Sequence, residues 1–184
     1  MKKMLTILTV LLISMSALQA QSFAKKGTFE IGGNVGFFSS SNVINGETGD
    51  ATNTLSFSSF TGYFITDGFE IGFAPLSYSV TTPANGDKIT NLSILFAPAY
   101  NFDLGSNIFP FIEGLVGYTS NSMGDNTSDG ISWGARGGIK LVVGQNALIN
   151  VGIQYTNYNY NPEGAEERNG SNNISANAGF AVFF

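Results

Sequence analysis

Histidine and cysteine are both absent from this chain of 184 residues. Without cysteine the fold has no disulfide, no thiolate nucleophile and no thiolate metal ligand. Without histidine it also lacks the general base on which most hydrolases depend. A serine hydrolase of this composition would need a lysine base, for which Lys140 is the candidate. We therefore predict that the protein is not an enzyme and holds no cofactor.

A calcium site is the one metal motif that the sequence suggests. Residues 125–130, Asp-Asn-Thr-Ser-Asp-Gly, faintly resemble a calcium-binding loop. The pattern fails at Thr127, where a stronger ligand is needed, and Arg136 stands near the position of the closing glutamate. We interpret the segment as a solvated turn, and we predict no metal site.

No apolar run is long enough for a membrane-spanning helix. Lys2 and Lys3 precede an apolar run over residues 5–13, and small residues lead from there to Ala20. This pattern predicts a secretory signal peptide over residues 1–20, cleaved from a mature chain that begins at Gln21. Cleavage after Ala24 is the alternative. The mature part, residues 21–184, has the length of a single domain.

Charge is scarce in the mature chain. Without Lys2 and Lys3, six of the eight basic residues remain against thirteen acidic ones, a net charge of −7. The lack of a basic run argues against binding to nucleic acid or to anionic lipid by charge alone. Charged residues make up only 11% of the chain, whereas 13% are aromatic and 23 residues are glycine. Such a composition is unusual for a water-soluble surface and suits a surface that faces lipid.

Helical periodicity is also absent after the signal peptide, and a two-residue period takes its place. The last eleven residues show it most clearly, with apolar side chains at every second position: Ile174, Ala176, Ala178, Phe180, Val182 and Phe184. Small or polar residues occupy most of the positions between them. The alternation predicts a β-strand with one apolar face.

The same signal recurs often enough to predict eight strands. They cover residues 28–38, 54–65, 69–80, 92–102, 108–119, 131–143, 149–155 and 174–184. A bulge is expected at Pro75, where the apolar parity changes. Short turns at 66–68, 103–107 and 144–146 alternate with longer polar segments at 39–53, 82–88, 120–130 and 161–172. We predict an all-β fold, an eight-stranded antiparallel up-and-down β-barrel that crosses a membrane.

Five charged residues fall on the inward face of the predicted barrel: Glu30, Glu70, Glu113, Arg136 and Lys140. Strands 108–119 and 131–143 are neighbours, so we expect Glu113 to pair with Arg136, with Lys140 nearer the short turns. One interpretation of this lumen charge network is structural. The other is a gate or solute site made of the same residues.

Bulky and small inward residues support the structural interpretation. The bulky ones gather near the short-turn end: Phe64, Phe109, Phe111, Val142, Leu148 and Phe183. Inward glycines are expected to make room for large neighbours: Gly32, Gly36, Gly117, Gly134 and Gly138. Eight strands enclose an interior that side chains can fill, so a wide aqueous channel is not expected.

Outward aromatic residues are predicted at both ends of the membrane-facing band, where they would anchor it at the two interfaces. Near the short turns stand Tyr63, Phe69, Tyr100, Phe102 and Phe184. Near the longer connections stand Phe37, Tyr118 and Trp133.

Three stretches carry a resemblance to a known family: Gly-Tyr-Phe-Ile-Thr-Asp at 62–67, Pro-Phe-Ile-Glu-Gly at 110–114, and the aromatic C-terminus. With them, the whole mature chain resembles the outer membrane protein β-barrel family, in its small eight-stranded OmpA/OmpX type. The resemblance implies a place in the outer membrane of a bacterium, with lipid and lipopolysaccharide as surroundings. It also implies an insertion signal at Phe180, Val182 and Phe184 for the barrel-assembly machinery. A monomer without nucleic-acid partners is expected, and the enzymes among such barrels that we compare rely on histidine.

Two functions remain open at this point. The first is a non-catalytic structural or surface-interaction role, in envelope integrity or adhesion, with the surface ligand unknown. The second is a narrow porin-like conduit for small or apolar solutes. A soluble barrel of lipocalin type is the third possibility. We rank it below the other two because its outer surface would need charged residues, and the outward positions here carry almost none. The acidic group at 163–168 is a solvated loop, or a divalent-ion bridge to lipopolysaccharide.

Overall fold

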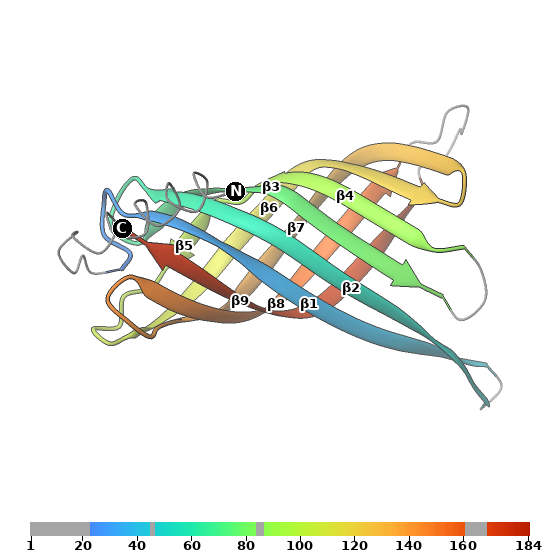
Figure 1. The fold of residues 1–184 in the computed structure, drawn as a ribbon, viewed down its shortest axis with the longest axis horizontal. Helices are drawn as coiled ribbons and strands as arrows, with labels where there is room; N and C mark the ends of the chain where they lie inside the picture. The colour runs from blue at the N-terminus through green and yellow to red at the C-terminus, as the bar shows by residue number, and fades with distance from the viewer. Residues whose placement is uncertain (1–22, 45–46, 84–86, 161–168) are drawn as a thin grey trace, which may run out of the picture.

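A barrel of antiparallel strands makes up the computed structural model, which describes residues 23–44, 47–83, 87–160 and 169–184 (Figure 1). The strands are β1 (Phe29–Ile44), β2 (Glu47–Phe64), β3 (Phe69–Thr82), β4 (Ile89–Phe96), β5 (Ala99–Asn101), β6 (Ile108–Met123), β7 (Asn126–Val142), β8 (Ala147–Tyr160) and β9 (Asn169–Phe183). Among these residues no helix is both long and apolar enough to cross a membrane.

The sheet closes on itself through its first and last strands. Strands that are adjacent in sequence pair with one another, apart from β4 and β5, and β1 pairs with β9 from Glu30 opposite Phe183 to Phe37 opposite Ala176. β4 and β5 occupy one position between β3 and β6, so the barrel has eight positions, as predicted. Closure leaves no sheet edge within the paired region, which a barrel in lipid requires.

The strand predicted over 92–102 is interrupted at Ala97 and Pro98. Proline has no N–H to donate to a neighbouring strand, which explains the break. Two backbone bonds hold the interruption in place: Ala97 N–H donates to the Gly72 carbonyl at 2.7 Å, and Gly114 N–H donates to the Pro98 carbonyl at 2.9 Å. The chain therefore continues along the same path through the break.

Side chains alternate between the outside and the lumen as the two-residue period predicts. On β4, for example, Ile94 is 63% exposed and its neighbour Leu95 only 4%. The parity change predicted at Pro75 is confirmed by a register shift between Ala74 and Ser77. Glu70 and Ala74 are buried before the shift, whereas Leu76 and Tyr78 are exposed after it.

Two of the predicted polar loops are largely strand. β1 and β2 extend to Ile44 and Glu47, and β6 and β7 to Met123 and Asn126, so the predictions of loops at 39–53 and 120–130 were wrong. Serine, threonine and asparagine favour turns, but a hairpin that projects beyond a membrane needs no apolar face. The three short turns lie where predicted. Residues 84–86 and 161–168 of the two other loops lie outside the described residues. The prediction of a loop was wrong for residues 169–172, which belong to β9 and pair with β8.

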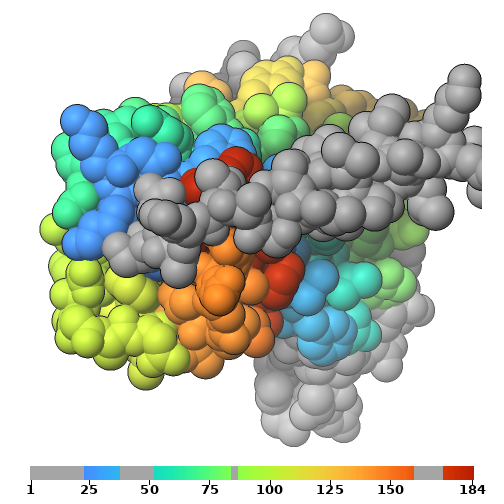
Figure 2. Space-filling view, turned by 60° about the vertical axis from the view of Figure 1, so that its left-hand side comes forward, coloured from blue at the N-terminus to red at the C-terminus, as the bar shows by residue number. Residues whose placement is uncertain are grey.

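The lumen is most tightly packed at the short-turn end. There Phe23, Phe64, Phe109, Leu148 and Phe183 form one buried cluster, which we call the phenylalanine plug. Figure 2 is turned toward this end, where residues 23–28 (blue), the short turns and the C-terminus (red) lie close together. Further along the lumen, Phe60 packs with Ala74, Leu95, Ala97 and Leu115.

Candidate functional site

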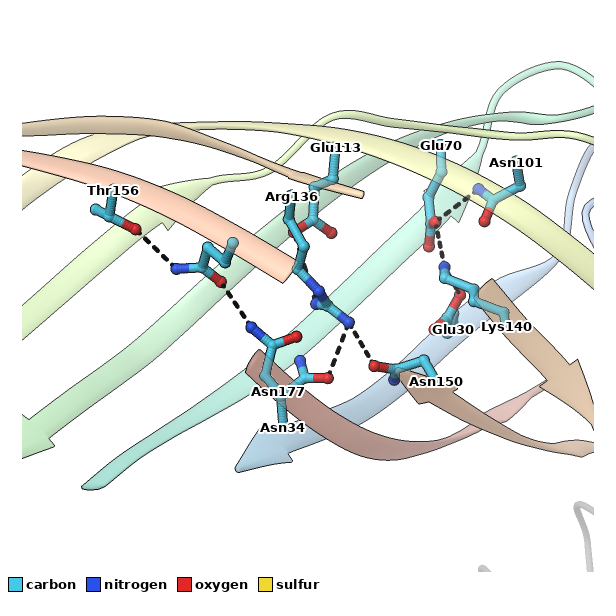
Figure 3. A network of polar contacts seen from close by, with 11 residues as sticks. Glu30, Asn34, Glu70, Asn101, Glu113, Arg136, Lys140, Asn150, Thr156 and Asn177 are labelled. Atoms are coloured by element: carbon cyan, nitrogen blue, oxygen red, sulfur yellow. Dashed lines mark hydrogen bonds and ion pairs between the residues drawn. The ribbon is translucent and has the colours of Figure 1, made fainter. Parts of the chain in front are cut away.

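Lys140 lies between two carboxylates that reach it across the lumen. Its Nζ is 2.7 Å from Oε2 of Glu30 and 3.1 Å from Oε2 of Glu70 (Figure 3). Asn101 donates from Nδ2 to the same Glu70 oxygen at 3.3 Å. All of these side chains are buried, so each charge depends on its partners in place of water.

Arg136 forms a second cluster further along the lumen. Its Nη1 is 3.7 Å from Oε1 of Glu113, and its Nη2 donates to Oδ1 of Asn34 at 3.1 Å and to Oδ1 of Asn150 (Figure 3). The guanidinium also lies 4.9 Å from the centre of the Phe111 ring. A planar group with five donors can satisfy several strands at once, which an ammonium could not do here.

The structure thus brings all five sequence-predicted charges into the lumen, but as two clusters. Glu113 and Arg136 are opposite one another on neighbouring strands β6 and β7. Lys140, in contrast, pairs with β1 and β3, neither of which is next to β7 in the sheet. In a barrel of eight strands a side chain spans the interior, so partners need not be neighbours. Asn101 and Asn150 were missed, although both have inward parity.

Phe23 is the residue of the plug that sequence reasoning missed. It precedes the first strand, yet it is 2% exposed and makes edge-on contacts with Phe64, Phe109 and Phe183 at centroid distances of 5.4, 5.0 and 5.2 Å. Lys140 Nζ lies 5.2 Å from the centre of the Phe23 ring, so the plug covers the charge network directly. The available signal was an aromatic residue between the predicted signal peptide and the first predicted strand.

Two basic residues fasten this N-terminal segment to the turns. Lys25 Nζ lies 3.3 Å from Oδ2 of Asp67 and 3.4 Å from Oδ2 of Asp103, and the Lys26 N–H donates to Oδ1 of Asp67 at 2.9 Å. The Lys26 N–H, and then Lys25, hold the pKa of Asp67 below its ordinary value. The same carboxylate, and then that of Asp103, raise the pKa of Lys25. Gly68 N–H completes the anchor by donating to the Ala24 carbonyl at 2.8 Å.

The inward glycines have a somewhat different role from the one predicted. A Cβ at Gly32, Gly117, Gly134 or Gly138 would collide with the backbone of an adjacent strand, and not with a large side chain across the barrel. Gly62, by contrast, leaves the space that the Glu70 carboxylate fills. Gly179 likewise leaves the space for Asn34 and Asn150, the partners of Arg136. The glycines therefore permit close strand approach, and Gly62 and Gly179 make room for the polar partners of the two clusters.

Beyond the charge network the lumen opens into a polar cavity of about 330 Å³, which we call the outer vestibule. Asn34, Gln154 and Asn177 line its inner part, above Arg136. Elsewhere among the buried side chains of the lumen, Thr119 Oγ1 bonds to Ser93 Oγ at 2.6 Å and donates to Ser132 Oγ at 2.7 Å. The cavities beside the charge network measure only about 10 and 20 Å³, room for about one water molecule each.

The outward residues lie at the surface as predicted. Tyr63, Phe69, Tyr100 and Phe102 are exposed near the short turns, and Phe37, Tyr118 and Trp133 near the long hairpins. Of the predicted insertion signal, Phe180 is 54% exposed, and Val182 and Phe184 are half-buried. Phe184 closes the ladder with Phe29, whose N–H donates to the Phe184 carbonyl at 2.7 Å. In the described part of the chain, no three histidine, cysteine or acidic residues come together as a metal site.

Comparison with protein families decides the identity of the fold. Residues 6–183 match the outer membrane protein beta-barrel domain. The chain belongs to this family. Comparison with the curated proteins gives no match.

Solved structures agree on the fold. The chain is similar to the Neisserial surface protein A, with a TM-score of 0.64 and 18% identity, over 86% of this chain and 98% of that one. It is also similar to the outer membrane protein OprG from Pseudomonas aeruginosa, with a TM-score of 0.51 and 17% identity, over 87% and 97% of the two chains. Family membership places the protein in the bacterial outer membrane, where the short turns face the periplasm and the long hairpins face outward.

Proposed function

We propose that this protein is a non-catalytic barrel with a structural or surface-interaction role, in envelope integrity or adhesion. The observation that carries the proposal is the sealed periplasmic half of the lumen. The phenylalanine plug, the Lys140 cluster and the Arg136 cluster succeed one another along the bore. A barrel filled in this way offers its outer ends to the surroundings and passes little through its middle.

The hydroxyl groups of the lumen support the absence of catalysis. Ser93, Thr119 and Ser132 bond to one another and are fully or almost fully buried. A hydroxyl nucleophile needs an adjacent base, and the sequence contains no histidine. Lys140, the candidate lysine base, is held by Glu30 and Glu70. Its ammonium serves as their counter-ion.

The surroundings of the protein follow from the same proposal. We infer a monomer in outer-membrane lipid and lipopolysaccharide, delivered by a signal peptide over residues 1–20 and inserted by the barrel-assembly machinery. The predicted signal peptide lies outside the described residues, as does the acidic group at 163–168. The burial of Phe23 and Ala24 supports cleavage before residue 23, and hence at Ala20 in preference to Ala24.

The outer vestibule favours a second candidate, the narrow conduit. Its polar lining reaches Asn34 and Asn177, close to the guanidinium of Arg136. A conduit would require the two charge clusters and the plug to part. The buried charges would then lose the partners that compensate the cost of their burial, which makes opening unfavourable.

Planar-bilayer conductance of the refolded protein separates the two candidates. A sealed barrel should give only small currents, and Arg136→Gln should change stability without a large change of current. Large currents through the unmutated protein, whose ion preference changes with Arg136→Gln, would establish the conduit and overturn our first proposal. Lys88→Gln, at an exposed position between β3 and β4, is the matched control for loss of one positive charge outside the two charge clusters.

A further inference from the structure

Most residues that line the outer vestibule carry neutral hydrogen-bonding side chains, and Phe57, Ile89 and Ile174 add apolar surface between them. Ten lining residues carry a hydroxyl group and six a side-chain amide, whereas none carries a carboxylate, an ammonium or a guanidinium. Thr54 and Thr81 represent the hydroxyls, and Asn121 and Gln154 the amides. Its volume of about 330 Å³ falls at the lower end of the range of small-molecule sites. Among the described residues, the lining of the vestibule is thus neutral, whereas the two charge clusters lie further toward the short turns.

Hydroxyls and amides both donate and accept, so the lining can match a ligand that does the same. Some of this capacity is unused within the protein. Asn177 donates from Nδ2 to Oε1 of Gln154 at 3.4 Å, but its own Oδ1 is buried without a protein partner. Gln154 in turn donates from Nε2 to Thr156 Oγ1 at 2.9 Å. An acceptor therefore remains at the inner part of the vestibule, on a side chain that its neighbours hold in place.

A charged ligand would fit this site poorly. It would lose part of its hydration on entering a partly enclosed cavity, and the lining offers no opposite charge in return. The guanidinium of Arg136, beneath, is engaged by Glu113, Asn34 and Asn150. An apolar ligand would instead leave many lining hydroxyls and amides without partners. The chemistry that remains is that of a small neutral polyol.

We propose that the outer vestibule is a binding site for a neutral polyhydroxylated small molecule, of the size of a monosaccharide or disaccharide. The proposal deepens the surface-interaction role, and it rests on it, because the sealed floor makes the vestibule a dead end. A sugar that enters from outside is bound there and leaves by the same way. Glycan ends or free sugars share this chemistry.

The test is a calorimetric titration of the protein refolded in a phosphocholine detergent, since glucoside or maltoside headgroups would themselves compete. Glucose and maltose are the neutral probes, and glucuronate and glucosamine are their charged counterparts. We expect saturable binding of at least one neutral sugar at millimolar concentration, and binding at least about tenfold weaker for the charged pair. A bound sugar on a short glycan should compete with the free sugar.

Variants assign any binding to the vestibule. Asn177→Ala and Thr156→Val should each weaken it about tenfold, the equivalent of one hydrogen bond. Thr61→Val, on the outward face of β2, is the matched control and should bind as the unmutated protein does. The different gel mobility of heated and unheated samples verifies that each variant is folded. No saturable binding of glucose or maltose, equal binding of the charged sugars, or unchanged binding by both vestibule variants would each overturn the proposal.

Conductance of the same samples keeps this inference apart from the proposed function. Small currents without sugar binding would overturn the binding site and leave the surface role standing. Large currents would overturn the sealed barrel, and with it the dead-end site, even if sugars entered. Small currents together with sugar binding that the vestibule variants weaken would support both.

Discussion

Arg136 connects four strands of the barrel through its side chain. From β7 it contacts Glu113 on β6, Asn150 on β8 and Asn34 on β1, while its face covers Phe111. Each polar partner is a buried group that would otherwise lack a bond. A lysine ammonium lacks the planar arrangement of donors by which the guanidinium reaches these partners, so the geometry of the site favours arginine.

Replacement of Arg136 by alanine should therefore destabilise the barrel strongly. The variant leaves Glu113 buried without its main counter-charge, a loss of roughly 3–5 kcal/mol, or less where lumen water reaches the carboxylate. Urea unfolding of the refolded protein in lipid vesicles, followed by tryptophan fluorescence, measures the change.

The double variant Glu113→Gln with Arg136→Gln should recover part of that loss, because no charge is then stranded. Lys88→Gln, at an exposed position, serves as the control for loss of one positive charge and should change the stability by less than about 0.5 kcal/mol. If the double variant is as unstable as Arg136→Ala, the loss of stability does not come from an unpaired charge on Glu113, and the prediction is wrong.

The two charge clusters differ in how far the sequence could predict them. Glu113 and Arg136 face each other across one hairpin, so strand parity and a turn position suffice to pair them. The partners of Lys140 come from β1 and β3, and their proximity depends on the diameter and tilt of the closed barrel. No local pattern contains that information. A narrow bore is what makes such distant residues neighbours.

At the scale of the elements, the N-terminal segment acts as part of the core although it belongs to no strand. Phe23→Ala should cost about 3–5 kcal/mol of unfolding free energy, because it opens a cavity among buried aromatic rings. Phe23→Leu, which refills most of the volume, should cost much less. Thermal unfolding of both variants measures the difference.

Phe102→Ala provides the comparison, since Phe102 also has an edge-on aromatic contact, with Tyr100 at 4.9 Å, but is 41% exposed. Its loss should destabilise the protein less than that of Phe23. Equal losses for the two would mean that the plug adds nothing beyond an ordinary interface aromatic.

The anchor of this segment should respond to acid. Because the pKa of Asp67 is lowered in the folded protein, its contribution is fully present above the ordinary aspartate pKa. It is lost as the pH falls below about 4, through the folded value. The pKa of Lys25 is raised, so its contribution to the stability of the anchor is lost only as the pH rises above the ordinary lysine pKa.

The amide hydrogens of residues 23–28 should therefore be less protected from exchange at acid pH than at neutral pH. In Asp67→Asn their protection should be reduced at neutral pH as well. Asp125→Asn, on the opposite end of the barrel, controls for the loss of one carboxylate. A segment whose exchange ignores both Asp67 and acid would show that the anchor is not electrostatic.

The last strand allows the insertion signal to be separated from the ladder. Deletion of Phe184 removes both its ring and the two backbone bonds with Phe29, whereas Phe184→Ala keeps the bonds. We expect Phe184→Ala to refold in detergent as usual, yet to accumulate poorly in the outer membrane of cells. Phe184→Tyr should restore assembly. Normal membrane levels of Phe184→Ala would exclude the ring as a signal.

The elements show where sequence patterns fail for physical reasons. Alternation located every membrane-crossing strand and, with Pro75, the bulge of β3. Alternation did not predict the outer parts of β6 and β7, because residues 120–129 show no alternation of apolar and polar side chains. Their pairing comes from continuation of a ladder already formed lower down. Phe23 was missed because a single aromatic residue has no period.

At the scale of the whole molecule, the closed sheet predicts resistance to detergent. An unboiled sample in dodecyl sulfate should keep the compact barrel and migrate differently from a boiled one, because closure leaves no edge at which unfolding can begin. The boiled sample of the same protein is its own reference. Identical mobility, or purification in soluble form without detergent, would contradict a membrane barrel.

Pairing of the first strand with the last has a consequence for the time order of assembly. The ring cannot close before β9 is available, since the partners of β1 on β9 run from Ala176 to Phe183. A chain still in synthesis or transit therefore keeps two unsatisfied strand edges and a row of apolar side chains in water. We therefore expect the chain to be most prone to aggregation in the interval before β9 is available to pair with β1.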